Sequence, residues 1–209
     1  MITKKIETPE EFFNLKIPGV TTILSNIFGK DEFADIPKVV MDAAIERGKA
    51  VHSYIEHKIY NGEWEDIELA YQIYIDYFKE WEKEYEPTYL ASELMLSNEE
   101  DGYKGIIDTI FQYKDKDTGK IITCMCDWKT SSNLNRFKTM CQLNLYARMF
   151  EKHYDLKIDE IRTLSLTKTG WRFSKFELNP AISTSILYLN NLKKLYNNEW
   201  WWVICFKIK

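Results

Sequence analysis

The chain has 209 residues, of which 45% are hydrophobic and 15% aromatic, so it can bury a core and fits one domain over residues 1–209. The formal net charge of −4 argues against a broad basic surface for non-specific nucleic-acid binding. Residues 1–14 contain no apolar run, and no segment approaches the ~20 apolar residues of a membrane span, so we expect a soluble protein that is neither exported nor membrane-bound.

Two helices are predicted in the first half of the chain. Apolar residues recur at helical spacing over residues 39–60, and Gly62 follows as a stop signal, so this segment predicts a helix that carries His52. A second helix is predicted over residues 67–85, with aromatic residues along one face and Pro87 beyond its end. Such a face can stack nucleic-acid bases, but it packs in a core far more often, and we favour the core.

The second half of the chain predicts strands and two further helices. Strand patterns cover residues 88–97, 103–113 and 120–129, with a tight turn over 114–119 between the last two. Residues 135–154 return to helical spacing, and residues 158–167 and 171–178 predict a hairpin around Thr169 and Gly170. Pro180 opens a final helix. The predicted order is therefore helix, helix, three strands, helix, two strands, helix.

The chain contains four cysteines, and two of them, Cys124 and Cys126, lie in the third predicted strand. A Cys-X-Cys pair can bind metal. Cysteines in an alternating apolar strand usually act as small hydrophobic residues, so core packing is the favoured interpretation.

Two aspartates are predicted to meet across the second and third strands. A turn centred on Asp117 and Thr118 places Asp108 directly opposite Asp127. Opposed residues have Cβ atoms about 4.5–5.5 Å apart, and two like charges there are destabilising unless something compensates them. A divalent cation would do so, although a bulge or a longer turn would shift the register and separate the two carboxylates.

Alternation along the third strand adds an amine to this pair. Asp127 and Lys129 share one face, whereas Cys124, Cys126 and Trp128 point to the other. Two carboxylates and one amine suit metal-assisted hydrolysis of a phosphodiester, where oxygen ligands hold Mg²⁺ or Mn²⁺ and the amine orients or helps to deprotonate water, or stabilises charge on phosphate. The alternative is a surface ion pair between Lys129 and one aspartate, which would contribute little.

Four short stretches resemble motifs of the PD-(D/E)XK nuclease superfamily, and within it of the RecB-like exonuclease branch. They follow the family's order and spacing over residues 47–146: Arg47-Gly48-Lys49-Ala50-Val51-His52, Gly105-Ile106-Ile107-Asp108, Asp127-Trp128-Lys129-Thr130 and Gln142-Leu143-Asn144-Leu145-Tyr146. The resemblance implies an α/β (α+β) fold with a restriction-endonuclease-like core, in which helices flank a central mixed β-sheet in the order helix, three strands, helix, strand.

The resemblance also implies which residues act. Lys129, Asp127 and Asp108 would be catalytic, and the metal ligands would be His52, Glu93, Asp108, Asp127 and the backbone carbonyl of Trp128. Nucleic acid would be contacted by Gln142 and Tyr146, which lie four residues apart on one helix face, and by Arg47 and Arg136. Further cations near the predicted site are Lys104, Lys138 and Arg148, although isolated cations are usually just solvated. His57 and His153 match no motif and are expected at the surface.

The activity implied is that of a Mg²⁺- or Mn²⁺-dependent DNA exonuclease with one or two ions, resembling phage-type and plasmid-type enzymes of recombination, repair or replication. Such an enzyme would work in the cytoplasm of a bacterial or phage-infected cell, with DNA as partner, any unwinding supplied by a helicase or recombination partner, and a possible homo-oligomer. The cysteine positions do not match the iron–sulfur cluster of some members, so no cluster is expected. Alternatives are an endonuclease of the same superfamily and a non-catalytic binding subunit. The three tryptophans at residues 200–202 could stack bases, form an oligomer contact or pack in the core.

Overall fold

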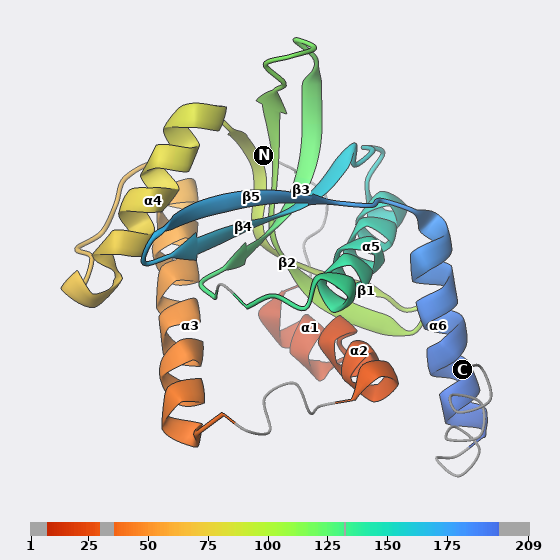
Figure 1. Cartoon of the computed structure of the whole chain (residues 1–209). Coiled ribbons are helices and arrows are strands. Elements are labelled where there is room, and N and C mark those ends of the chain that lie inside the picture. Colours follow the sequence, from red (N-terminus) through yellow and green to blue (C-terminus); the bar gives the residue numbers. More distant parts are fainter. Residues whose placement is uncertain (1–7, 30–35, 132, 197–209) are drawn as a thin grey trace.

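The structure is a computed structural model that describes residues 8–29, 36–131 and 133–196 (Figure 1). The cluster of tryptophans at residues 200–202, and Cys205, lie outside the described residues. The elements in chain order are α1 (Pro9–Asn14), α2 (Val20–Phe28), α3 (Lys38–Asn61), α4 (Leu69–Tyr85), β1 (Thr88–Asn98), β2 (Tyr103–Lys114), β3 (Ile121–Lys129), α5 (Arg136–His153), β4 (Glu160–Thr167), β5 (Gly170–Phe176) and α6 (Pro180–Leu195). The predicted order of helices and strands is confirmed from α3 onwards.

Two short helices at the start of the described chain were not predicted. α1 begins with a capping box, in which the Thr8 hydroxyl accepts from the Glu11 N–H and the Glu11 carboxylate accepts from the Thr8 N–H. α2 buries Val20, Ile23 and Leu24, which are spaced to lie on one helix face. Each helix is too short for its apolar spacing to stand out in the sequence.

The five strands form one mixed sheet in the order β1-β2-β3-β4-β5. All neighbouring strands are antiparallel except β3 and β4, which are parallel and are connected through α5. The predicted register of β2 and β3 is confirmed, since Thr109 pairs with Cys126 and the pairs beyond follow the same alignment. The described ladder ends there, one pair short of Asp108 and Asp127.

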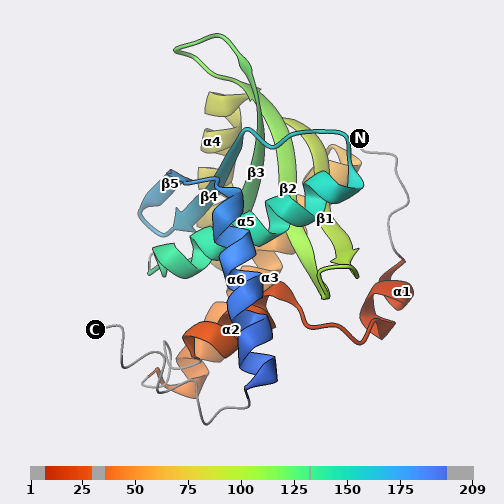
Figure 2. The same ribbon diagram turned by 90° about the vertical axis from the view of Figure 1, so that its right-hand side faces the viewer.

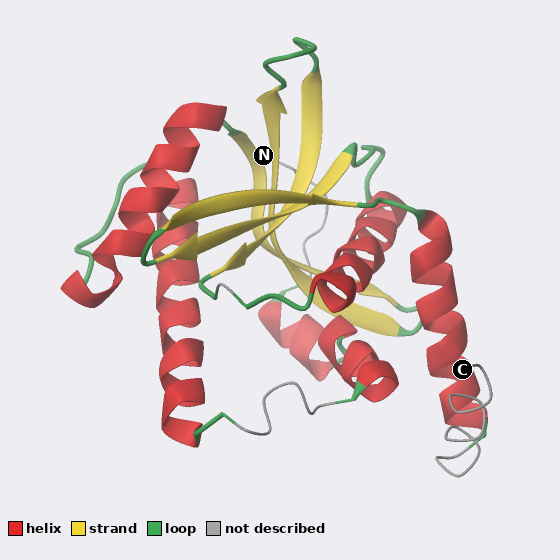
Figure 3. Ribbon diagram, viewed as in Figure 1, coloured by secondary structure: helices red, strands yellow, loops and turns green. Residues whose placement is uncertain are grey.

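Helices cover both faces of the sheet, as Figure 3 shows in red and yellow. On one face, α2, α5 and α6 pack against residues such as Met125 and Ile161, and Figure 2 shows α5 and α6 in front of the strands. On the other face, α3 and α4 enclose an aromatic core in which the Trp128 ring lies 5.5 Å from Phe78 and 5.6 Å from Trp81, measured between ring centroids. This packing confirms the core interpretation of the aromatic face of α4.

The cysteines that the structure describes are also core residues, as the alternation predicted. Cys124 and Cys126 lie in the aromatic core, and Cys141 lies on the opposite face of the sheet. Burial raises the pKa of all three thiols, which keeps them protonated and inert. Among the described helices, none combines the length and the apolar character that crossing a membrane requires.

Candidate metal centre

Three side chains from three different elements converge where α3 crosses the sheet. His52 comes from α3, Glu93 from β1 and Asp108 from β2, and each offers a ligand atom within 4.8 Å of the other two. His52 Nδ1 lies 3.5 Å from Glu93 Oε1 and 3.7 Å from Asp108 Oδ2. The cluster joins one nitrogen donor to two carboxylates, which is a donor set that a divalent cation can use.

The backbone of Trp128 fixes two members of this cluster. Its N–H donates to Asp108 Oδ2 over 2.8 Å, and its carbonyl oxygen lies 3.0 Å from His52 Nε2. A carbonyl can only accept, so His52 Nε2 carries the proton and Nδ1 is the ring nitrogen that faces the carboxylates. The Trp128 side chain points into the aromatic core, so one residue connects the cluster to the core behind it.

The pKa values of Asp108 and His52 are both raised, so the cluster binds protons more tightly than the free side chains do. Burial, together with the nearby Asp127 carboxylate, raises the pKa of Asp108 to about 7. For His52, burial lowers the pKa, but the hydrogen bond with Glu93 and the charges of Asp108, Glu93 and Asp127 outweigh it and raise the pKa to about 9. A group of acids that cannot all ionise unless a positive charge joins them is the electrostatic condition for a cation site.

Glu93 adopts an unusual backbone conformation. Its φ is 46°, in the left-handed region that residues with a side chain rarely adopt. The neighbouring residues on β1 pair with β2, Ser92 with Thr109 and Leu94 with Ile107. A non-glycine residue held in this region between two paired neighbours is a strained position of the kind that gathers at functional sites.

Asp127 and Lys129 form a second group beside the cluster. Lys129 Nζ lies 2.6 Å from Asp127 Oδ2, and Gln142 Nε2 donates to Asp127 Oδ1 over 3.4 Å. Asp127 is only 3% exposed, and the Lys129 ammonium is the partner of its Oδ2. Sequence reasoning expected Asp127 among the metal ligands, whereas here its carboxylate turns towards Lys129 and Gln142, outside the three-residue cluster.

Gly105 on β2 and Tyr146 on α5 are in close contact, and this contact requires a glycine at position 105. A Cβ at Gly105 would lie 2.4 Å from Tyr146 Cε1, so only glycine lets the ring pack flat against β2. The ring is buried, and its hydroxyl lies 3.4 Å from Gln142 Nε2, which in turn reaches Asp127. Two of the motifs found in the sequence are therefore parts of one contact that positions Gln142.

A cleft of about 490 Å³ opens over the centre, and its lining combines cations, hydroxyls and the cluster. The residues are Ala44, Arg47, Gly48, Lys49, His52, Ser53, Glu56, Glu93, Trp128, Lys129, Thr130 and Ser131. The guanidinium carbon of Arg47 lies 5.7 Å from the centroid of the Tyr74 ring, and its buried Nε has no hydrogen-bond partner among the described residues. The positive charges of Arg47, Lys49 and Lys129 in the lining suit an anionic ligand.

Glu56 is a member of this region that sequence reasoning missed. It lies one helical turn after His52 and lines the same cleft. Burial and the charge of Glu93 raise its pKa, while His52 lowers it, so it responds to the cluster electrostatically. The spacing of four residues from His52 was the available signal in the sequence.

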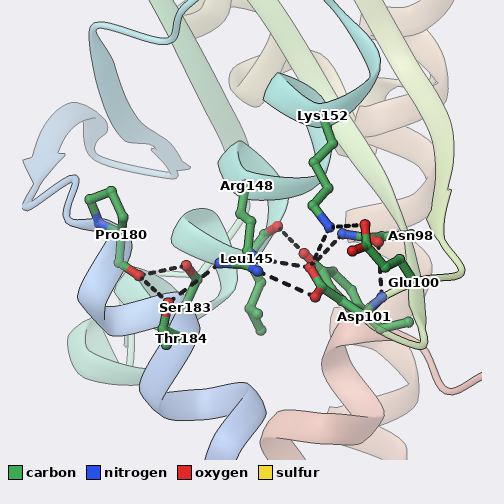
Figure 4. Close-up of polar contacts among 10 residues, drawn as sticks. Asn98, Glu100, Asp101, Leu145, Arg148, Lys152, Pro180, Ser183 and Thr184 are labelled. Atoms are coloured by element: carbon green, nitrogen blue, oxygen red, sulfur yellow. Dashed lines mark hydrogen bonds and ion pairs between the residues drawn. The ribbon is translucent and has the colours of Figure 1, made fainter.

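Two of the cations considered in the sequence are committed to structural contacts. Lys104 donates to the carbonyls of Phe12 and Leu15 and so holds the N-terminal segment. Arg148 pairs with Asp101 over 2.8 Å in a network that joins the β1–β2 turn to α5 and α6 (Figure 4). The Lys104 ammonium and the Arg148 guanidinium are therefore not available for a phosphate contact at the centre, because both hold these elements together.

Three other predicted residues have contacts that the sequence did not reveal. Arg136 lies in a separate groove, beside β4 and β5, that shares no lining residue with the metal cleft. His153 is half-buried, and its Nε2 lies 2.6 Å from the Ser97 carbonyl. His57 is also half-buried, and its Nδ1 lies 3.9 Å from Glu65.

The residues present fit a hard divalent cation. The cluster supplies carboxylate oxygens and one imidazole, and the buried carboxylate of Asp127 lies beside it. No described cysteine takes part, because all three are in the cores. Oxygen-rich donors with one histidine suit Mg²⁺ or Mn²⁺ better than a thiophilic metal.

No family model and no curated protein matches the chain. Similar solved structures do exist. One is a crystal structure of a candidate exonuclease from Eubacterium rectale, with a TM-score of 0.51 and 12% identity over 91% of this chain and 85% of that one. Another is the protein SSO0001, with 14% identity over 86% of this chain and 75% of that one, and a TM-score of 0.39 that carries no argument. The chain thus has an α+β fold similar to that of the Eubacterium rectale protein, with a mixed sheet between helices and a cluster able to bind a divalent cation.

Proposed function

We propose that this chain is a Mg²⁺- or Mn²⁺-dependent nuclease of the PD-(D/E)XK type. The observation that carries the proposal is the convergence of His52, Glu93 and Asp108 next to the ion pair of buried Asp127 and half-buried Lys129. A cation site adjoining a charged lysine, in a cleft lined by further cations, is the arrangement that phosphodiester hydrolysis requires.

The proposed ligands are His52 through Nδ1, Glu93 and Asp108, with the Asp127 carboxylate beside them. The Trp128 carbonyl was also expected as a ligand, but it faces Nε2 on the other side of the imidazole ring, so it orients His52 and does not bind the same ion. When bound, the cation would polarise the phosphodiester and make a nearby water a better nucleophile. Asp108 is held in place by the Trp128 N–H, and His52 by the Trp128 carbonyl, so the ligands are oriented before any ion arrives. Glu93 holds its position through a fixed backbone conformation.

Lys129 is proposed to stabilise charge. Although burial lowers its pKa, Asp127 and Asp108 more than compensate and hold the pKa above its ordinary value of 10.5. The side chain therefore carries its proton at neutral pH, which favours stabilising the charge that develops on phosphate oxygens over removing a proton from water. Gln142 restrains the other oxygen of Asp127 and so fixes the direction of the pair.

The proposed substrate is DNA, cut from its ends or in single strands, in recombination, repair or replication. Arg47, which lines the cleft, and Gln142 are proposed to contact the nucleic-acid backbone. Tyr146 was expected to contact it too, but its ring is buried, so its proposed role is to position Gln142. The fold similarity to a candidate exonuclease supports a nuclease, and exonuclease action is the form that we propose.

Incubation of purified protein with end-labelled linear DNA tests this proposal. Single and double strands are compared in Mg²⁺, Mn²⁺ and EDTA, with Asp127→Ala as the inactive control. Metal-dependent shortening by the natural chain alone supports the nuclease and reveals its polarity. If the natural chain cleaves a closed circular DNA as readily as a linear one, the protein is an endonuclease. If it cleaves neither DNA nor RNA, the proposal is overturned.

A further inference from the structure

A second groove lies beside the metal cleft, between the start of α5 and the β4–β5 hairpin. Its volume is about 340 Å³, and its lining contains two arginines, several hydroxyl and amide side chains and two large apolar side chains: Asn133, Leu134, Arg136, Ser165, Thr167, Thr169, Gly170, Trp171, Arg172 and Ser174. None of these lining residues is acidic, although the whole chain has a net charge of −4. The groove is therefore locally positive on an acidic protein.

The strand register connects this groove to the metal centre. Lys129 on β3 pairs with Ser165 on β4, and Ser165 pairs with Arg172 on β5. Paired residues point to the same face of a sheet, so these three side chains form a row across it. With a strand spacing of about 4.8 Å, the backbone of Arg172 lies about 10 Å from that of Lys129.

The chain segment after β3 borders both sites. Thr130 and Ser131 line the metal cleft, and Asn133 and Leu134, a few residues later, line the groove. Described residues on the two sides of position 132 therefore line the two sites. A single extended ligand can contact Lys129 and the groove together.

The two arginines are available to an anion. Arg172 is exposed, and across residues 8–29, 36–131 and 133–196 neither Arg172 nor Arg136 has a carboxylate partner. The Arg136 guanidinium lies over the Phe176 ring, with its carbon 4.7 Å from the ring centroid. Stacking restrains the guanidinium while leaving its N–H groups free, and the planar fork matches phosphate oxygens.

The geometry points to a phosphate subsite, formed by Arg136, Arg172 and the hydroxyls of Ser165 and Ser174, that holds the backbone of a single nucleic-acid strand beside the metal centre. The inference rests on the proposed nuclease function and extends it to a strand-binding track across β4 and β5. Contacts of this kind read phosphates and sugars, so the subsite binds strands of any sequence.

Binding of a fluorescein-labelled oligothymidylate, followed by anisotropy in EDTA over a range of KCl concentrations, tests the subsite without cleavage. The variants are Arg172→Ala and Arg136→Ala, with Arg172→Lys to keep the charge while losing the fork. The matched control is Lys120→Ala, which removes an exposed cation from the β2–β3 turn, away from both sites. Thermal melting shows that each variant folds.

Each arginine variant is expected to raise Kd by about tenfold, and Arg172→Lys by less, because a charge-assisted contact is lost. The slope of log K against log salt should become shallower by about 0.7 for each lost phosphate contact on a single strand. Lys120→Ala should match the natural chain. Folded arginine variants with the Kd and salt slope of Lys120→Ala would overturn the subsite.

A small diester separates this inference from the proposed function. Bis(p-nitrophenyl) phosphate reaches the metal centre but is too short to reach the groove, so Arg172→Ala should cleave it at the natural rate while losing kcat/KM on the oligonucleotide. If the natural chain cleaves neither substrate but the arginine variants still weaken strand binding, the nuclease proposal fails and the subsite stands. If the natural chain cleaves both and the variants match it on both, the subsite alone fails.

Discussion

His52 contacts its surroundings through both ring nitrogens, and this double attachment decides its behaviour. Nε2 faces the Trp128 carbonyl, and Nδ1 faces Glu93 and Asp108. Without a cation, a proton on Nδ1 is the only positive charge that the ring can offer to the two carboxylates. Metal and proton therefore compete for the same place.

The metal-free protein is expected to lose stability as the pH rises. The pKa of His52 rises from 6.5 to about 9 on folding, so its bound proton stabilises the folded chain fully below pH 6.5, and this contribution disappears as the pH passes through about 9. The difference corresponds to at most about 3 kcal/mol. Urea unfolding in EDTA between pH 6 and 10 measures it, with Glu93→Gln as the comparison. Equal pH dependence in both proteins would contradict the role of Glu93.

Lys129→Ala is expected to lower the cleavage rate by about 100-fold or more, since one stabilising charge is lost from the transition state. It should also destabilise the metal-free protein by about 1–3 kcal/mol, because Asp127 Oδ2 stays buried without its partner. Lys120→Ala is the control, because Lys120 is an exposed cation at the β2–β3 turn and lines neither the cleft nor the groove. Comparable activity of the two variants would remove Lys129 from the mechanism.

At the scale of elements, patterns of local chemistry predicted more than patterns of apolar spacing alone. The Asp-Thr-Gly sequence of the turn between β2 and β3 predicted the register of these two strands, since a short turn allows few alignments of the strands that it joins. The pairing of Asp108 and Glu93 with His52 needed three elements to meet, and only the family resemblance suggested it. Three features depend on tertiary contacts and could not be predicted from a local sequence pattern. They are the orientation of Asp127 towards Lys129, the left-handed backbone of Glu93 and the partial burial of His153.

The two glycines of the matching motifs should respond in opposite ways to alanine. Gly105→Ala places a Cβ 2.4 Å from Tyr146 and should cost about 1–3 kcal/mol while displacing Gln142. Gly48 lies inside α3, where the nearest atom to a new Cβ is Thr130 Oγ1 at 3.8 Å, so Gly48→Ala should stabilise by up to about 1 kcal/mol. Denaturant unfolding of both variants in EDTA measures the difference, and a stabilised Gly105→Ala would show that the ring moves freely.

The network at the β1–β2 turn should matter for stability alone. Arg148→Ala breaks the pair with Asp101 that joins this turn to α5, and it should cost about 1 kcal/mol because the pair is partly screened by solvent. Cleavage should stay at the natural rate, in contrast to Arg172→Ala on the same oligonucleotide. A clear fall in kcat/KM for Arg148→Ala would return this arginine to the nucleic-acid contacts.

For the molecule as a whole, the candidate metal centre joins α3, β1, β2 and β3 at one point, so binding of a cation there should stabilise the whole fold. A ligand at 100 times its Kd stabilises the folded state by about 2.7 kcal/mol. Mn²⁺ should therefore raise Tm of the natural chain by several degrees.

Asp108→Asn should abolish the Mn²⁺ effect. It should also leave the metal-free protein at pH 8 as stable as the natural chain or more so, because a buried carboxyl with a pKa of about 7 is replaced by a neutral amide. Scanning fluorimetry with and without EDTA measures both effects, and an unchanged Mn²⁺ shift in Asp108→Asn would exclude this residue as a ligand.

Trp128 contributes only main-chain atoms to the centre, while its ring belongs to the aromatic core. Natural variation at this position is therefore governed by packing partners and not by chemistry. In diverging lineages, the residue between the aspartate and the lysine should exchange freely among large apolar side chains, and should covary with Phe78 and Trp81 rather than with His52 or Glu93.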